Sequence, residues 1–276
     1  ALAAVHEVVA AGWNIQYGAR CVSTTDIPLQ AGCSSSSAFC VAWVQVLARL
    51  SGVSLTRIEV AQMAHRAEVV HFGSPGGTMD HVTSALGGIL RIGPGMWDVQ
   101  RLDNTAGASD HIWVLADSGQ PKDTLGHLRR CKDDRLSLLE KLGGTWDGTP
   151  TSPLSETEQV LLAATKTTRD AEIWAAREWA TADAESLGKR MQEHHDALRD
   201  GLLLSTPRLE AMRKAALEAG AFGFKLVGSG GGGTGVAWAS DQTTAKAVAK
   251  AMVDAGAVKT WIIDQPNGFP GASVVA

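Results

Sequence analysis

The chain has 276 residues, of which 45% are hydrophobic and 20% are charged, so it is long enough to bury one large core or two smaller ones. This composition excludes a disordered or a collagen-like chain. The 25 lysines and arginines stand against 29 aspartates and glutamates, which gives a net charge of -4. Because no basic excess is available to hold a phosphate backbone, we expect no nucleic-acid partner.

The apolar stretches and the cysteines indicate a soluble protein. The longest mostly apolar run, residues 38–50, is shorter than the roughly 20 residues that span a bilayer, so we expect no membrane partner. Residues 1–12 lack the basic start and the long apolar stretch of a secretion signal. The four cysteines lack the paired CxxC spacing of a zinc site and suit a reducing cytoplasm, where we expect the protein to be located.

Hydrophobic periodicity and glycine punctuation predict a mixed first half. We expect helices over residues 3–11, 38–50, 56–72 and 79–86. Strands are expected over residues 21–26, 88–92 and 112–116.

The second half is predicted to be helical at first and mixed at its end. Helical periodicity covers residues 124–142, 155–166, 170–199 and 206–219. A hairpin of 225–227 with 234–239 follows, then a helix over 241–255 and a strand over 258–263. This β-β-α-β ending is typical of the α+β class.

Small residues at 27–38 precede a long apolar helix. Small side chains let backbone N–H groups approach an anion, and the positive end of the helix dipole favours phosphate. The serine hydroxyls of this segment can bind Mg²⁺ or a phosphate oxygen. A plain serine helix cap explains the same pattern equally well. The segment is not a Walker A loop, because no Gly-Lys-Ser or Gly-Lys-Thr triplet is present.

Two carboxylates flank a glycine-proline turn. Glu68 lies near the end of one predicted helix, and Asp80 lies just past the turn at residues 73–77. If they face one cavity, one can hold a metal ion while the other accepts a hydroxyl proton. The alternative is that both are solvated charges, with Asp80 near a helix start.

A glycine cluster occupies residues 228–234, between two apolar strand-like runs. Glycine has no Cβ and tolerates positive φ, so such a loop can lie directly against a nucleotide or a neighbouring loop. A generic glycine linker is the alternative, but linkers seldom lie between two strands.

Taken together, the order and content of these three segments resemble the GHMP small-molecule kinases, the superfamily of galactokinase, homoserine kinase, mevalonate kinase and phosphomevalonate kinase. Residues 28–38 approximate the second motif of the family, Pro-x-x-x-Gly-Leu-x-Ser-Ser-Ala, with Cys33 in place of leucine and Ser37 in place of alanine. Residues 228–234 approximate its glycine-rich third motif.

Within the family, two stretches are most similar to the galactokinase branch. Ala67-Glu68 and Met79-Asp80-His81 resemble that branch's Ala-Glu and Gly-x-Pro-x-Gly-Ile-Met-Asp-Gln, and their spacing also fits. Residues 191–200 resemble its Met-x-x-Ser-His-x-Ser-Leu-Arg-Asp. The similarity extends over most of the chain, from residue 3 to about residue 263.

The resemblance implies an α+β fold with a GHMP kinase-like two-domain architecture. A ribosomal protein S5 domain 2-like N-terminal part would cover residues 1–105, and a ferredoxin-like C-terminal part would cover residues 106–276. The implied activity is ATP-dependent phosphorylation of a sugar hydroxyl, with ATP and Mg²⁺ as cofactors and a small-molecule sugar as the substrate.

The resemblance also implies roles for individual residues. Ser36 and Glu68 would bind Mg²⁺, and Asp80 would orient or deprotonate the acceptor hydroxyl. The phosphates would contact Gly32, Cys33, Ser34, Ser35 and Ser36, buttressed by Gly228, Ser229, Gly230, Gly231 and Gly232. All three segments are expected to converge on one triphosphate pocket.

Two departures from the family pattern keep alternatives open. The first motif, which in galactokinases contains Gly-Glu-His-x-Asp-Tyr, has no counterpart, so we expect that an N-terminal segment is missing and leave the activity of this chain open. Gly231 replaces the usual phenylalanine, as in the heptose-phosphate kinases, so neither the sugar nor its hydroxyl is assigned. The alternatives are a heptose-phosphate or mevalonate-type kinase and a non-catalytic sugar and nucleotide sensor. The oligomeric state is not predicted.

The histidines and tryptophans outside these motifs favour structural roles. His194 and His195 point about 100° apart on a helix, so we expect one solvated ring and one packed ring rather than a metal pair. The nine tryptophans are dispersed along the sequence and are expected to anchor the cores.

Overall fold

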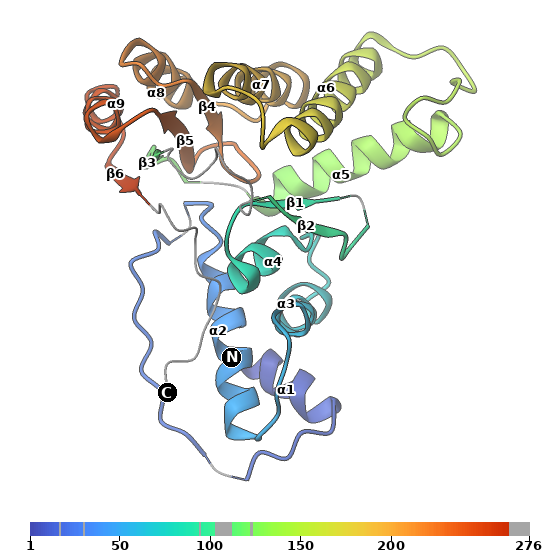
Figure 1. The fold of residues 1–276 in the computed structure, drawn as a ribbon. Helices are drawn as coiled ribbons and strands as arrows, with labels where there is room; N and C mark the ends of the chain where they lie inside the picture. The colour runs from blue at the N-terminus through green and yellow to red at the C-terminus, as the bar shows by residue number, and fades with distance from the viewer. Residues whose placement is uncertain (17, 30, 94, 103–111, 122–123, 265–276) are drawn as a thin grey trace. The chain divides into compact units, whose positions relative to one another are not determined.

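A computed structural model describes the chain except for residues 17, 30, 94, 103–111, 122–123 and 265–276 (Figure 1). The chain divides into two compact units. The N-terminal unit comprises residues 1–29, 34–104 and 267–276, and the C-terminal unit comprises residues 30–33 and 105–266. The domain boundary predicted between residues 105 and 106 lies outside the described residues.

The N-terminal unit is mainly helical. Its core consists mainly of apolar residues from five helical elements, among them Val8, Val44, Ala61 and Val82, which are wholly buried. Its strands β1 and β2 pair antiparallel, with Leu90 opposite Arg101. The elements are α1 (Leu2–Ala10), α2 (Ser35–Leu50), α3 (Arg57–His65), the π-helix η1 (Arg66–Val70), α4 (Met79–Leu86), β1 (Leu90–Ile92) and β2 (Val99–Arg101).

Two local predictions for this unit differ from the structure. The predicted strand over residues 21–26 is wrong, because these residues are exposed and no described strand pairs with them. Their β-branched side chains alone do not make a strand, since a strand needs a partner and a buried face. Helix α2 begins at Ser35 rather than at residue 38, so three serines of the small-residue segment form its first turn.

The C-terminal unit contains a four-stranded antiparallel sheet with the strand order β4-β5-β3-β6. The predicted hairpin is confirmed, because Gly223 pairs with Trp238 and Leu226 pairs with Gly235. The strands are β3 (Ile112–Asp117), β4 (Gly223–Leu226), β5 (Thr234–Ala239) and β6 (Lys259–Ile263). The helices are α5 (Thr124–Lys141), α6 (Glu156–Glu178), α7 (Ala184–Asp196), the π-helix η2 (Ala197–Gly201), α8 (Pro207–Glu218) and α9 (Gln242–Asp254).

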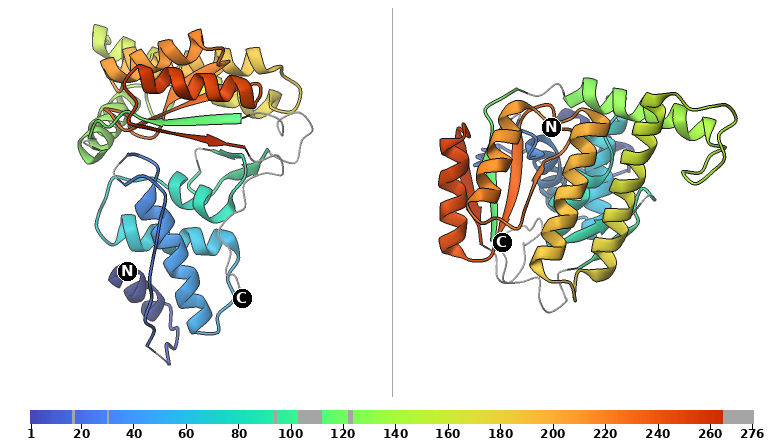
Figure 2. Two further views of the ribbon diagram at one scale, coloured as in Figure 1. Left: turned by 90° about the vertical axis from the view of Figure 1, so that its left-hand side faces the viewer. Right: turned by 90° about the horizontal axis from the view of Figure 1, so that it is seen from above.

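The two faces of this sheet differ, because side chains alternate along each strand. Val114 and Ala237 lie on the face covered by α8 and α9 and join one core with residues of both helices, such as Met212 and Met252. Figure 2 shows these helices stacked on that side of the sheet. Trp113 and its cross-strand partner Trp238 project from the opposite face. In the described part of the chain, no helix is both long and apolar enough to cross a membrane.

The predicted break between residues 166 and 170 is wrong, because α6 runs without interruption from Glu156 to Glu178. The region of the expected break contains no glycine or proline, and Lys166 and Arg169 both pair with Asp147 on the exposed side of the helix, at 3.3 and 2.9 Å. The break comes instead before α7, whose first turn is capped by the side chain of Asp183.

The adjacent histidines of α7 have different surroundings. His195 is fully buried; its Nδ1 accepts the backbone N–H of Leu226 at 3.1 Å, so its Nε2 carries the proton that is donated to Glu210 at 2.8 Å. Burial lowers the pKa of His195 against the opposing effect of Glu210, and the ring is neutral. His194 is partly buried, and burial together with the charge of Lys225 lowers its pKa to about 3.

We therefore expect the free energy of unfolding to fall as the pH drops from about 6.5 toward about 3. In this range the unfolded chain binds a proton at His194 while the folded chain does not, so acid favours unfolding. In His194→Gln, the free energy of unfolding should fall less between these two pH values than in the parent. The difference should be at least roughly 1.4 kcal/mol, the free energy that corresponds to a pKa shift of one unit. Thermal unfolding midpoints measured across this pH range test the expectation. The control is His6→Gln at an exposed position, and parallel curves for His194→Gln and the parent would contradict it.

Candidate functional site

In the described part of the chain, the first turn of α2 has no side-chain cap for its backbone amides. Ser34 occupies the position before the helix in a left-handed conformation, with φ 56° and ψ 34°, and its side chain makes no capping hydrogen bond. The interpretation of this serine as a plain helix cap is therefore wrong. The N–H groups of residues 35–37 have no partner within the helix, and such groups attract an anion.

Glu68 lies where three elements of the N-terminal unit meet. It belongs to the π-helix η1, a rare geometry that occurs frequently at functional sites. Its carboxylate accepts hydrogen bonds from the hydroxyl groups of Ser36 and Ser37 in α2. A third hydrogen bond comes from Nε2 of His81 in α4, at 2.7 Å. The Glu68 side chain is 24% exposed, so its carboxylate is held but still reachable from solvent.

The electrostatics keep Glu68 ionised. Burial raises the pKa of Glu68, but the hydrogen bonds from His81, Ser36 and Ser37 outweigh burial and lower it to about 2. Because an ionised carboxylate only accepts hydrogen bonds, Nε2 of His81 carries the proton. Burial, together with the charge of Glu68, raises the pKa of the neighbouring Cys40 to about 11, so this thiol stays protonated and is no nucleophile.

Asp80 lies in the first turn of α4, directly before His81. It is half-buried, and the N-terminal end of the helix dipole stabilises its negative charge. Among the described residues, no cation lies within 4.0 Å of its carboxylate, whereas Glu68 is engaged by its neighbours. The Asp80 carboxylate can therefore accept a hydrogen bond from a polar group of another molecule.

The oxygen donors of this cluster fit a magnesium ion. Mg²⁺ prefers carboxylate and hydroxyl oxygens, which Glu68 and Ser36 supply side by side. The hydroxyl of Ser36 donates its proton to Glu68, so its lone pairs remain for a cation. Sequence reasoning identified Ser36 and Glu68 but missed that Ser37 and His81 hold the Glu68 carboxylate, because nothing in the spacing shows which way these side chains point.

In the C-terminal unit, Cys33 lies beside the glycine hairpin. Its Sγ is 3.6 Å from Oγ1 of Thr234, the fully buried first residue of β5. The structure thus brings the segment Gly32-Cys33 together with one end of the predicted third motif.

The glycines of the hairpin are required by close packing. The N–H of Gly231 donates to the carbonyl of Leu204 at 2.6 Å, and the N–H of Gly233 donates to the carbonyl of Gln120 at 3.0 Å. A Cβ on Gly232 would lie 2.9 Å from the carbonyl oxygens of Gln120 and Pro121, and its φ of 127° disfavours any other residue. These glycines therefore allow contact with neighbouring backbone, and the amides of Gly231 and Gly233 are already occupied.

The predicted site residues thus fall into two groups. In the N-terminal unit, Ser36 contacts Glu68, and Asp80 stands next to the histidine that binds this carboxylate. In the C-terminal unit, Cys33 contacts the end of the hairpin. The roles of Gly32, Ser34, Ser35, Gly228, Ser229 and Gly230 at a nucleotide, and the convergence of all three segments on one triphosphate pocket, stay predictions.

Comparison with known proteins connects the chain to named kinases. The mevalonate kinase of Thermococcus gammatolerans is 30% identical over 230 residues, which cover 82% of this chain and 61% of that protein. The galactokinase of Mycobacterium bovis is 27% identical over 252 residues, which cover 86% of this chain and 68% of that protein. The chain therefore spans about six tenths of the length of the mevalonate kinase that it matches.

The fold also matches solved kinase structures. Lactococcus lactis galactokinase complexed with galactose superimposes with a TM-score of 0.76 at 16% identity, over 98% of this chain and 75% of that chain. This likeness confirms the predicted two-domain α+β fold. The family model described as GHMP kinases N terminal domain matches residues 1–88, and the model described as GHMP kinases C terminal matches residues 173–258. With both family models matched in order and the fold shared with these kinases, the chain belongs to the GHMP kinase family.

Proposed function

We propose that this chain forms the phosphoryl-transferring part of an ATP-dependent kinase whose acceptor is a hydroxyl group of a small polar molecule. The observation that carries the proposal is the cluster of Ser36, Glu68 and His81 next to Asp80. In phosphoryl transfer, a protein mainly positions the reactants and neutralises the charge of the phosphates. This cluster supplies oriented hydrogen-bond donors and two carboxylates, one for the metal ion and one for the acceptor hydroxyl.

The N-terminal turn of α2 and Glu68 would form the phosphate and metal side of the site. The uncapped amides of residues 35–37 are suited to accept phosphate oxygens. Ser36 and Glu68 would hold Mg²⁺, and His81 keeps the Glu68 carboxylate oriented by binding one of its oxygens. The ion, when bound, neutralises charge on the phosphates.

Asp80 would form the acceptor side of the site. A hydroxyl placed against its carboxylate is oriented for attack and can pass its proton to Asp80. The division of labour follows from the surroundings, because Glu68 already accepts three hydrogen bonds while Asp80 has no cation beside it among the described residues.

A sugar is the first candidate for the acceptor. The stretches around Glu68 and Met79-Asp80-His81 are similar to the galactokinase pattern in content and spacing. Mevalonate is the second candidate, because relatives named mevalonate kinase are 30% identical to this chain over most of its length.

The expected result of an acceptor screen is ADP release in the presence of Mg²⁺ with one class of acceptor. The panel is galactose, further aldoses and mevalonate, and binding of a non-hydrolysable ATP analogue is measured alongside by calorimetry. Turnover with an aldose supports the sugar kinase, whereas turnover with mevalonate alone supports the second candidate. Nucleotide binding without any ADP release would favour a non-catalytic sensor, and the absence of both would contradict the proposal.

Replacing Asp80→Asn should lower turnover by about 100- to 10,000-fold, the usual contribution of general acid–base catalysis. The amide keeps the shape of the side chain but cannot take up the hydroxyl proton. The affinity for the ATP analogue should stay the same, because Asp80 is assigned to the acceptor. The matched control is Asp26→Asn at an exposed position. Unchanged turnover in Asp80→Asn would remove this residue from the reaction.

Replacing Glu68→Gln should weaken the effect of Mg²⁺ on nucleotide binding. Glutamine still offers His81 an oxygen acceptor but lacks the charge that holds the ion. Mg²⁺ should raise the affinity for the ATP analogue by a factor that is at least about tenfold smaller in Glu68→Gln than in the parent. Even residues that only support a metal ligand change metal affinity by this much when they are replaced. Glu7→Gln, in the same unit, is the control. An equal effect of Mg²⁺ in Glu68→Gln and the parent would show that the ion is held elsewhere.

A further inference from the structure

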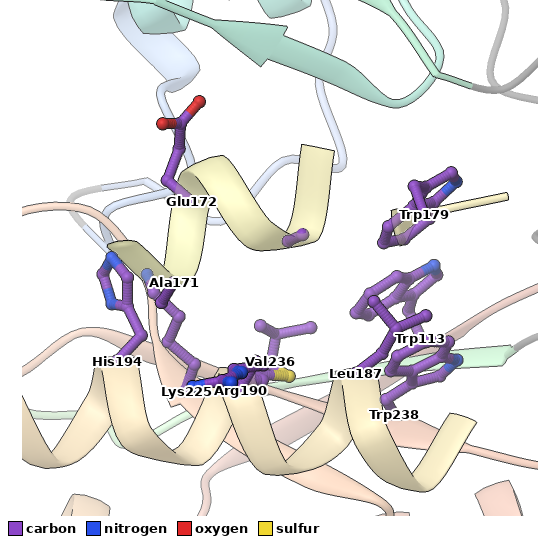
Figure 3. Close-up of a pocket in the computed structure, with 12 residues that line it drawn as sticks. Trp113, Ala171, Glu172, Trp179, Leu187, Arg190, His194, Lys225, Val236 and Trp238 are labelled. Carbon is purple, nitrogen blue, oxygen red and sulfur yellow. The ribbon is translucent and has the colours of Figure 1, made fainter. Parts of the chain in front are cut away.

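The C-terminal unit contains a cavity of about 290 Å³ that has no part in the proposed reaction. It lies between one face of α7, the C-terminal half of α6, and the sheet face that α8 and α9 leave open (Figure 3). This volume is close to the lower limit of pockets that hold small organic molecules.

Three tryptophans form one end of the cavity. The rings of Trp113 and Trp238 are stacked with centroids 5.2 Å apart and planes within 13°. Trp179 stacks on Trp238 at 6.1 Å, again within 13°. They come from three elements, β3, β5 and the end of α6, and Figure 3 shows them grouped on one side of the cavity. Such a wall favours a flat apolar group, which gains both area burial and aromatic contact.

A lysine without a counter-charge forms the other end. Lys225 on β4 is half-buried, and the hydrogen bond recorded for its Nζ goes to the carbonyl of Leu226 at 3.2 Å. Among the described residues, no carboxylate lies within 4.0 Å of this Nζ. Burial lowers the pKa of Lys225 to about 8, so the amine is still mainly charged at pH 7. A half-buried charge that has one carbonyl acceptor and, among the described residues, no counter-charge costs free energy, and a bound anion would lower this cost.

The remaining polar groups at this end do not neutralise Lys225. His194 lies on the same side of the cavity, and its Nδ1 has no hydrogen-bond partner among the described residues. Arg190 lines the floor and pairs with Glu193 at 2.7 Å, so the carboxylate of Glu193 is already engaged by an arginine. Glu172 lines the rim, and Figure 3 shows its carboxylate turned away from Lys225 and from the tryptophans. The lining of the cavity is thus almost wholly apolar, with the tryptophans at one end and the side chain of Lys225 at the other.

We propose that this cavity binds a small aromatic carboxylate, with its ring against the tryptophans and its carboxylate on Lys225. An aliphatic anion would lose the contact with the stacked rings, and a neutral aromatic molecule would leave the lysine unpaired. The site contains none of the residues assigned to phosphoryl transfer, so it offers a second ligand position in this chain.

The test compares two probes of equal shape, 3-phenylpropionate and its neutral amide. Binding is followed by calorimetry and by the quenching of tryptophan fluorescence. We expect the acid to bind at least about tenfold more tightly than the amide, because only the acid forms an ion pair with the lysine. Equal affinity of the two probes, or binding of neither, would overturn the proposal without requiring any variant to fold.

Two variants locate the site. Lys225→Met keeps the aliphatic stem and should abolish the preference for the acid, whereas Lys189→Met, at an exposed position of helix α7, should leave it unchanged. Trp113→Leu should weaken both probes alike. If a folded Lys225→Met protein still preferred 3-phenylpropionate over its amide, the carboxylate would bind at another group, and the proposal would be wrong. Competition by the ATP analogue at this lysine would identify the cavity as a nucleotide site instead.

Discussion

The N-terminal unit is organised around one carboxylate that is largely removed from water. Burying an ionised carboxylate is unfavourable unless hydrogen bonds replace its hydration. Glu68 receives such bonds from α2 and α4, while it belongs itself to η1. Because the donors come from different helices, satisfying this single charge also fixes the positions of the three helices around it. The apolar contacts among these helices supply most of the stability, and the carboxylate selects one arrangement among those that bury similar area.

The same hydrogen bonds link structure to chemistry. They keep Glu68 ionised, and a carboxylate must be ionised to bind a metal ion. They also direct the hydroxyl protons of Ser36 and Ser37 toward Glu68. The lone pairs of Ser36 and the uncapped amides of the first turn of α2 would then be available to a ligand. A helix that begins with a serine in a left-handed conformation cannot cap itself in the usual way, and this local cost is typical of sites that serve a ligand.

Local patterns predicted the helices well, and they predicted contacts poorly. Helix α4 has the bounds that its periodicity and its closing glycine indicate. The strand over residues 21–26 was wrong because β propensity cannot reveal the lack of a partner. The break near residue 168 was wrong because the sequence there contains no glycine or proline that would end a helix. Glu68 and Ser36 were identified through a family resemblance. The hydrogen bond from His81 to the Glu68 carboxylate could not be predicted, because the sequence does not show which way the imidazole ring points.

The cavity of the C-terminal unit could not be predicted for the same reason, since Trp113, Trp179 and Trp238 are far apart in the sequence and meet only through the pairing of β3 with β5 and the end of α6. Its lysine and Glu68 illustrate one physical criterion. Both charges are partly removed from water, but Glu68 has three donors from this chain and Lys225 has one carbonyl acceptor. A satisfied charge organises the protein around it, whereas a charge left short of partners in an accessible cavity is stabilised most by a molecule from outside. The number of hydrogen-bond and ion-pair partners that the chain supplies to a partly buried charge therefore indicates its role. A charge with several partners stabilises the fold, and a charge with few partners favours binding of a ligand.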